Sequence, residues 1–231
     1  MTGPRPARPH LTLERKLAAS QVDLIAGLDE VGRGALAGPL VAAAVVLPIE
    51  QRGLRRTLAG VRDSKQLTDS QRRTWADRVR QIALDYGLGL TTPSEIDEIG
   101  PLAGTLLAME RALDALSRPP RHLLLDHVAL PSVPVAQTSI THGDATVLSI
   151  AAASVLAKVW RDDLMLIYDR TYPAYGFAHH KGYGTLEHVA ALGRLGPCPI
   201  HRLSFHPVVS LDAGETDTLE SSGEQGDGLL A

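Results

Sequence analysis

The chain has 231 residues, 44% of them hydrophobic, which is enough apolar material for one globular domain with an appendage. No run of about 18 uninterrupted apolar residues occurs, and residues 1–10 lack the apolar stretch of a secretion signal, so we expect a cytoplasmic protein without a membrane partner. Cys198 is the single cysteine, which excludes an internal disulfide and a thiolate metal cluster within one chain.

Charge is unevenly distributed along the chain. The formal net charge is −3, but residues 211–231 carry 6 of the 26 acidic residues and no basic ones. Without them, 20 acidic residues face 23 basic ones, and the resulting charge of about +3 has the sign that a phosphate backbone favours. The composition predicts a disordered acidic tail over residues 211–231 and a flexible segment over residues 1–20.

The first predicted strand, residues 24–28, delivers two carboxylates into a glycine-rich loop. Asp29 and Glu30 suit a hard divalent cation, and the glycines after them let backbone N–H groups approach a phosphate or a sugar. Adjacent residues of a regular strand point to opposite faces, so both side chains reach one centre only if the chain leaves strand geometry between them. Taken alone, the pair is more typical of a polar turn, and other segments must support the metal interpretation.

Apolar spacing and capping signals predict the remaining elements. In chain order they are a buried strand at 38–47, a helix from a cap at Thr68 to about 84, a strand at 86–90, a helix capped by Ser94 and continuing to 116, a strand at 122–125, a weaker strand at 133–140, and helices at about 147–168 and 185–192. This order predicts an α/β domain over residues 21–170, with a mixed β-sheet flanked by helices, and a small C-terminal helical unit over residues 171–210.

Two more carboxylates complete a candidate site. Asp126 ends the strand at 122–125, where ligands of such sheets gather. Asp162 shares one helix face with Ser154 and Lys158, because the three are spaced by four residues. An exposed Lys-Asp pair explains that spacing equally well. With Asp29 and Glu30, these acids form the ligand set of a two-metal phosphodiester hydrolase.

Six motifs, in this order, resemble the bacterial ribonuclease HII (type 2 ribonuclease H) family over roughly residues 25–208. They are Gly-Leu-Asp-Glu-Val-Gly-Arg-Gly at 27–34, Asp-Ser-Lys-Gln-Leu at 63–67, the strand ending at Asp126, the run from Ser-Ile-Ala-Ala-Ala-Ser to Trp-Arg-Asp at 149–162, His-Lys-Gly-Tyr-Gly-Thr at 180–185, and His-Arg-Leu-Ser-Phe at 201–205.

The resemblance implies a ribonuclease-H-like fold and a monomeric endonuclease. It implies cleavage of the RNA strand of RNA/DNA hybrids, and cleavage 5′ to single ribonucleotides in duplex DNA, leaving 5′-phosphate and 3′-hydroxyl ends. Two Mg²⁺ or Mn²⁺ ions would be held by Asp29, Glu30, Asp126 and Asp162. Gly32, Arg33 and Gly34 would read the ribose 2′-OH largely through backbone groups. Tyr183 would stack on the sugar at the junction, and Lys65, Lys158 and Lys181 are candidates for phosphate contacts.

Two positions depart from the family pattern. His142 stands where the family usually has lysine, which weakens a phosphate-contacting charge at neutral pH because an unperturbed histidine has a pKa near 6.5. His127 follows Asp126 where the family usually has glycine, and its side chain either crowds the metal site or turns outward.

Three alternatives stay open. Four histidines, His179, His180, His188 and His201, suggest a zinc hydrolase, although their spacing matches no common zinc motif. A nucleic-acid-binding protein without catalysis is a second alternative, which the presence of all four acids disfavours. A type 3 ribonuclease H or a DNA resolvase is the third. The 20 or so residues before the first strand are too few for the extra N-terminal domain that type 3 enzymes carry.

Overall fold

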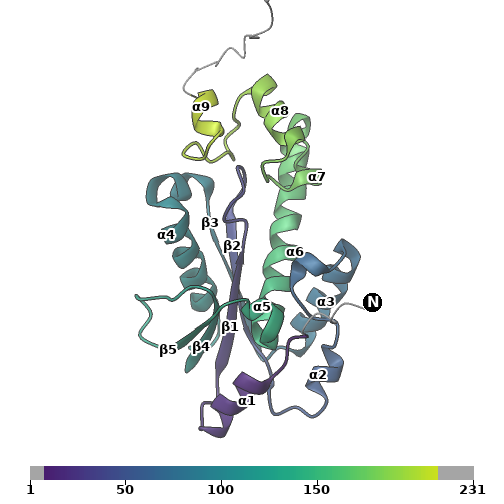
Figure 1. Ribbon diagram of the computed structural model, residues 1–231, viewed down its shortest axis with the longest axis vertical. Helices are drawn as coiled ribbons and strands as arrows, with labels where there is room; N and C mark the ends of the chain where they lie inside the picture. The colour runs from purple at the N-terminus through teal and green to yellow at the C-terminus, as the bar shows by residue number, and fades with distance from the viewer. Residues whose placement is uncertain (1–7, 213–231) are drawn as a thin grey trace, which may run out of the picture.

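The computed structural model describes residues 8–212, which form a central five-stranded sheet covered by helices on both faces (Figure 1). The strands are β1 (Ile25–Val31), β2 (Leu40–Val46), β3 (Asp85–Thr91), β4 (His122–Asp126) and β5 (Ala136–Ile140). Their order across the sheet is β3-β2-β1-β4-β5, with β1/β2 and β2/β3 antiparallel and β1/β4 and β4/β5 parallel. The mixed sheet expected from the sequence is therefore confirmed.

Two long helices cover the two faces of the sheet. They are α4 (Pro93–Asp114) on one side and α6 (Leu148–Thr171) on the other, as Figure 1 shows. Residues of β1 and β2 alternate between two apolar clusters, with Val41 on the α6 side and Leu40 on the α4 side. At Gly27 the backbone of α6 comes so close that an added Cβ would lie 2.3 Å from the carbonyl carbon of Ser149. This close approach fixes the distance between the start of α6 and the body of β1.

Shorter helices complete the molecule. They are α1 (Thr12–Ala19), α2 (Leu54–Thr57), α3 (Asp69–Ile82), α5 (Gly143–Thr146), α7 (Phe177–His180), α8 (Leu186–Leu195) and α9 (Val208–Asp212). The capping box predicted at Thr68 is confirmed for α3. The cap of α4 was misplaced by two residues, because Thr92 rather than Ser94 accepts from the backbone N–H of Glu95.

The N-terminal and C-terminal predictions have different outcomes. The flexible segment predicted for residues 1–20 is wrong for α1, because the buried side chain of Glu14 accepts hydrogen bonds from the backbone and the hydroxyl of Ser149 at 3.0 Å. The acidic tail predicted for 211–231 lies, from residue 213 on, outside the described residues. Within the described range, no helix has the length and apolarity that crossing a membrane requires.

The C-terminal segment returns to the loop between β1 and β2. Ala37 and His201 form an isolated antiparallel bridge, and the backbone N–H of Arg202 donates to the carbonyl of Leu36 at 2.9 Å. On the other side, the carboxylate of Asp97 in α4 accepts from the backbone N–H groups of Leu203 and Ser204 at 2.8 and 3.0 Å. Residues 201–204 therefore clamp the loop that follows β1.

Candidate active site

Asp29 and Asp126 lie side by side near the carboxyl ends of the two central strands. β1 and β4 are parallel and Leu28 pairs with Leu125, so the next residues along, Asp29 and Asp126, are neighbours on one face. Asp29 is only 6% exposed. One carboxylate oxygen of Asp126 accepts a 2.7 Å hydrogen bond from the backbone N–H of Gly143, which orients the side chain.

Glu30 lies on the opposite face of the strand from Asp29. We expected the chain to leave strand geometry between the two residues, so that both side chains could reach one centre. This expectation is wrong, because β2 continues to pair with β1 through Val31. The chain leaves the strand only at Gly32, where φ is +88°. The Glu30 carboxylate, 16% exposed, lies 3.8 Å from the Arg33 guanidinium. The carboxylates of Glu30 and Asp29 can therefore bind neighbouring cations only past the end of β4, where the edge of β1 is no longer covered by a paired strand.

A fourth carboxylate, Asp144, lies beside this group and is not among the ligands predicted from the sequence. Asp144 is in α5, which follows β5, the strand next to β4, and it is 8% exposed. Burial raises the pKa of Asp144, and the charges of Asp63 and Asp126 raise it further. A signal for Asp144 was available, because Asp144 follows the predicted strand at 133–140 after a short loop, whereas Asp126 ends its own strand.

The carboxylates repel one another in a site that excludes much of the water. Burial raises the pKa of Asp29 well above its ordinary value, and the charge of Glu30 adds to the rise. Asp126 and Asp144 act in the same direction, while a hydrogen bond from Ser154 opposes them. Burial alone would lower the pKa of Lys65, but the carboxylates around that lysine raise it. The cluster therefore holds an excess of negative charge beside one lysine.

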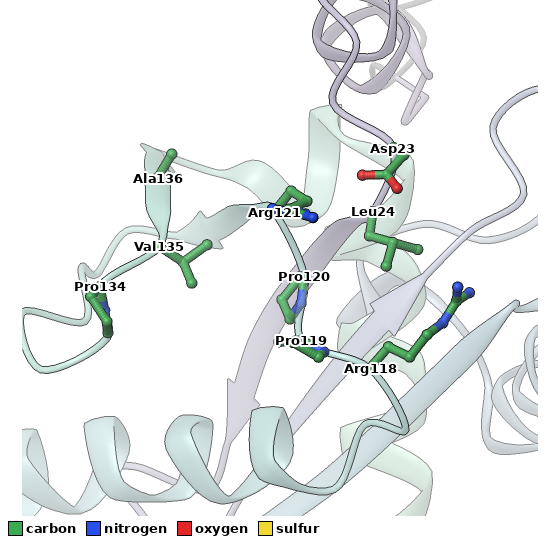
Figure 2. Close-up of a pocket in the computed structure, with 9 residues that line it drawn as sticks. All are labelled: Asp23, Leu24, Arg118, Pro119, Pro120, Arg121, Pro134, Val135 and Ala136. Carbon is green, nitrogen blue, oxygen red and sulfur yellow. The ribbon is translucent and has the colours of Figure 1, made fainter.

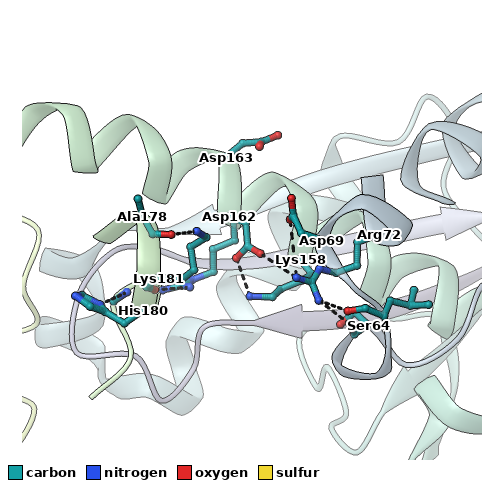
Figure 3. Close-up of polar contacts among 12 residues, drawn as sticks. Ser64, Asp69, Arg72, Lys158, Asp162, Asp163, Ala178, His180 and Lys181 are labelled. Atoms are coloured by element: carbon teal, nitrogen blue, oxygen red, sulfur yellow. Dashed lines mark hydrogen bonds and ion pairs between the residues drawn. The ribbon is translucent and has the colours of Figure 1, made fainter. Parts of the chain in front are cut away.

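Asp162, by contrast, lies in a cluster of basic side chains. Its two oxygens are 2.7 Å from Lys158 Nζ and 4.0 Å from Arg72 Nη2, and Figure 3 shows this group. Ser154, which reaches Asp29, precedes Asp162 by eight residues of α6, or about 12 Å along the helix axis. The charges that act most strongly on the pKa of Asp29 do not include Asp162. The structure thus does not bring Asp162 to the other three predicted ligands.

The donor set of the carboxylate cluster fits a hard divalent cation. Every candidate ligand is a carboxylate, and such oxygens are the preferred ligands of Mg²⁺ and Mn²⁺. Within residues 8–212, no three side chains of the ligating types are already arranged around one point. The cluster is a set of neighbouring, partly oriented carboxylates whose surplus charge a cation would neutralise.

The loop predicted to read the ribose connects β1 to β2. Gly32 is buried and has a positive φ, and an added Cβ would lie 2.1 Å from Arg161 Nε, so the position requires glycine. Arg33 and Gly34 are exposed, and nothing lies within 4 Å of a Cβ added at Gly34. The backbone at Arg33 and Gly34 is therefore open to a large ligand.

Tyr183 is half-buried beside two cations of α6. Its ring centroid is 5.2 Å from the Arg161 guanidinium and 5.9 Å from Lys158 Nζ. The ammonium group of Lys181 contacts the carbonyl of Ala178, and its backbone carbonyl accepts from Arg161 at 2.9 Å. Tyr183 and Lys158 thus lie together, and Lys65 lies apart from them among the carboxylates.

Three of the four histidines of the zinc alternative do meet, but their ring nitrogens are already used. The rings of His180 and His188 stack at 4.3 Å, and the Nε2 atoms of His188 and His201 are 3.0 Å apart. The backbone N–H of Cys198 donates to Nδ1 of His201, so His201 Nε2 carries the proton and donates to His188. Burial lowers the pKa of both residues to about 4. His179 is exposed, and the described residues offer no histidine metal group.

Both departures from the family pattern fall at left-handed backbone positions. His127 has φ of +63° and His142 has φ of +56°, a region that glycine adopts most easily. Both residues are exposed. His127 therefore turns outward and does not crowd Asp126.

A surface hollow at the opposite end of the sheet is unrelated to this chemistry. It has a volume of about 640 Å³ and lies before the amino-terminal ends of β1 and β4, among Asp23, Leu24, Arg121 and nearby prolines (Figure 2). The carboxylates follow the carboxyl ends of the same strands.

Comparisons with known proteins agree with this geometry. A family model described as Ribonuclease HII matches residues 26–208. Ribonuclease HII of Synechococcus sp. (strain JA-3-3Ab) is 50% identical over 208 residues, covering 90% of this chain and 93% of the relative. Ribonuclease HII of Syntrophotalea carbinolica is 50% identical over 198 residues, covering 86% and 92%.

Solved structures give the same fold. The ribonuclease H2 from Pyrococcus horikoshii OT3 superposes with a TM-score of 0.69 at 27% identity, covering 83% of this chain and 98% of that one. Bst-RNase HIII in complex with Mn²⁺ superposes with a TM-score of 0.59 at 18% identity, covering 87% and 73%, a likeness of fold alone. The ribonuclease-H-like fold expected from the sequence is confirmed.

Proposed function

Because the chain belongs to the ribonuclease HII family, and is therefore a metal-dependent endoribonuclease that cleaves the RNA strand of RNA/DNA hybrids, we propose that its carboxylate cluster is the catalytic centre. Asp29, Glu30 and Asp126 hold two divalent cations, Mg²⁺ or Mn²⁺. The observation that carries this proposal is the group of buried carboxylates at the ends of β1 and β4, where burial first and the charge of Glu30 second raise the pKa of Asp29.

The residues around the cluster divide the work of the reaction. When bound, the cations supply a hydroxide at neutral pH and stabilise the departing 3′-oxygen, so that cleavage leaves 5′-phosphate and 3′-hydroxyl ends. Asp29 and Asp126 are held at fixed places by the parallel strands and by the Gly143 N–H. Lys65, beside the carboxylates, contacts the phosphate next to the cleaved bond.

Recognition of the substrate falls to the neighbouring loops. The backbone of Gly32, Arg33 and Gly34 reads the ribose 2′-OH, and Tyr183 stacks on the sugar at the junction between ribonucleotide and deoxyribonucleotide. Lys158 and Lys181 contact phosphates farther along the duplex. The lysine roles require the ammonium groups to exchange their present partners, Asp162 and the Ala178 carbonyl.

The identity of the fourth ligand is a choice between two aspartates. Asp162 was predicted from the sequence, but its carboxylate is paired with Lys158 and close to Arg72. Asp144 is near Asp126 and lacks such pairing with a cation in the described residues. We favour Asp144 as the fourth ligand, with Asp162 holding Lys158 and Arg72 in place.

The physiological setting follows from the substrate. We propose that the protein acts as a cytoplasmic monomer on hybrids and on duplex DNA that contains single ribonucleotides. The excess of basic residues outside the acidic tail supports binding to such a duplex.

A cleavage assay on duplex DNA with one embedded ribonucleotide tests the function. With Mg²⁺ or Mn²⁺, the unaltered protein should cut 5′ to the ribonucleotide, and EDTA should abolish the cut. Asp29→Asn and Asp126→Asn should each lower the rate by at least about 1,000-fold while duplex binding stays measurable, because each removes ligand charge without changing shape.

Exposed Asp77 supplies the matched control. Asp77→Asn makes the same chemical change on the exposed face of α3, at a residue that is paired with Arg80 and does not belong to the cluster, and should leave the rate unaltered. Near-normal turnover in Asp29→Asn or Asp126→Asn, or cleavage that persists in EDTA, would defeat the assignment.

A further inference from the structure

Two arginines are completely buried behind the loop that follows β1. Arg161 and Arg202 are both 0% exposed, and no carboxylate of the described residues lies within 4.0 Å of either. Burial lowers the pKa of Arg202 to about 9, so its guanidinium is still charged at neutral pH. A buried charge is costly unless it is fully hydrogen-bonded, and its partners here are backbone carbonyls.

Arg202 binds three carbonyl groups of the loop. Its Nη2 donates to the carbonyls of Gly32 at 2.7 Å and Gly38 at 2.9 Å, its Nη1 donates to that of Arg33 at 2.8 Å, and its Nε also donates to Gly38 at 3.1 Å. The fork of one planar guanidinium thus fixes two consecutive peptide groups, those after Gly32 and after Arg33.

Because a peptide bond is planar, the direction of these carbonyl groups also fixes the direction of the N–H groups of Arg33 and Gly34. In a trans peptide, the C=O of one residue and the N–H of the next point in opposite directions. Because the carbonyls of Gly32 and Arg33 point inward at Arg202, the N–H groups of Arg33 and Gly34 point away from it. Neither N–H donates a hydrogen bond to any described part of the chain, and both residues are exposed.

We propose that Arg202 is a positioning residue for ribose selectivity: it holds the loop so that the N–H groups of Arg33 and Gly34 face the 2′-oxygen of the ribonucleotide. This inference rests on the proposed function of the loop and adds the residue that sets its geometry. The selectivity depends on the fork of the guanidinium, because Arg202 holds the carbonyls of Arg33 and Gly32 through two different nitrogens in one rigid plane. The donors of a lysine share one nitrogen at the end of a flexible chain and do not reproduce that geometry.

Arg161 provides a contrast on the same side of the loop. It donates to the carbonyls of Pro39, Lys181 and Ala37 at 2.9 to 3.1 Å, but to neither carbonyl that Arg202 orients at Gly32 and Arg33. A variant at Arg161 therefore disturbs a buried guanidinium and the packing of the loop without releasing the two peptide groups concerned.

The test compares affinities for two duplexes of one sequence, with and without a single ribonucleotide, in EDTA to prevent cleavage. In Arg202→Lys, the preference for the ribonucleotide-containing duplex should fall about tenfold, roughly the value of one hydrogen bond. Affinity for the all-DNA duplex should stay within about twofold, because the phosphate-contacting lysines are untouched. Arg161→Lys should keep the preference. A purely structural role would weaken both affinities in proportion and leave their ratio unchanged, which would overturn the proposal.

A measurement on the unaltered protein covers the case in which Arg202→Lys does not fold. The amide resonances of Arg33 and Gly34 should shift more with the ribonucleotide-containing duplex than with the all-DNA duplex. Equal shifts would overturn the proposal. If the unaltered protein shows neither metal-dependent cleavage nor ribonucleotide preference, the proposed function fails first, so the two failures are distinguishable.

Discussion

The carboxylate cluster and the two buried arginines are neighbours that treat buried charge in opposite ways. Asp29, Glu30 and Asp144 are held together with pKa values that burial raises. Arg161 and Arg202 are buried even more completely, yet their donors bind backbone carbonyls. Buried charge without a partner of opposite sign indicates where a ligand binds. Buried charge whose hydrogen bonds are all made within the protein indicates a structural role next to that site.

The same difference separates the two aspartates that compete as fourth ligand. Asp144 belongs to the uncompensated cluster, and Asp162 belongs to a compensated one with Lys158 and Arg72. If the comparison is correct, removing charge from the first should affect chemistry, and removing charge from the second should affect stability.

Among the effects that follow from this comparison, the largest is a contrast between two isosteric variants. Asp144→Asn should lower the cleavage rate by about 100-fold or more, since it removes a ligand charge. Asp162→Asn should lower it by less than about tenfold, and should lower the melting temperature because Lys158 and Arg72 lose their buried partner. Rates and melting curves of both variants in Mg²⁺ check this. A larger loss of rate in Asp162→Asn would restore the ligand that the sequence predicted.

The second effect concerns Tyr183, which lies between the two regions. Its ring is beside Arg161, while its carbonyl is 2.9 Å from His188 Nδ1. Tyr183→Ala should impair cleavage at a single embedded ribonucleotide about tenfold more than cleavage of a long hybrid, because only the first requires the junction to be sensed by stacking. Tyr183→Phe, which keeps the ring, should restore most of the loss. Equal impairment on both substrates would remove this role.

The smallest effect is a difference in pH dependence between the two sides of the molecule. His188 and His201 have folded-state pKa values of about 4, below the unfolded value of 6.5. Between pH 6.5 and 4 the unfolded chain binds protons at these histidines and the folded chain does not. The two histidines therefore lower the stability of the folded protein as the pH falls. Asp29 has a raised pKa, so its protonation in the folded state adds stability in acid.

Substitution separates these opposing contributions. Asp29→Asn removes the stabilising one, so its melting temperature should fall more steeply than that of the unaltered protein as the pH is lowered from 6.5 to 4.5. Adding His201→Gln to this variant should reduce that acid-dependent fall. Parallel melting curves for all three proteins would show that neither region titrates as the structure indicates.

Much of this protein can be predicted from its sequence, because the signals are local. Alternating apolar runs and caps predict the strands and helices of the sheet, and Asp29, Glu30 and Asp126 are recognisable because they lie at or next to strand ends. The glycines of the loop at 32–34 can be interpreted in the same way, since their backbone freedom is a property of the residue itself.

The tertiary structure decided the rest, for reasons of distance and direction. A spacing of four residues places Ser154, Lys158 and Asp162 on one face of α6, but only the packing of α6 on β1 determines that Ser154 reaches Asp29 and that Asp162 is about 12 Å farther along. Arg202 is 164 residues from Gly38, to which it binds, and no local pattern distinguishes it from an exposed arginine. Whether a charged side chain binds a ligand, supports the structure or lies on the surface depends on which residues the tertiary structure places next to it.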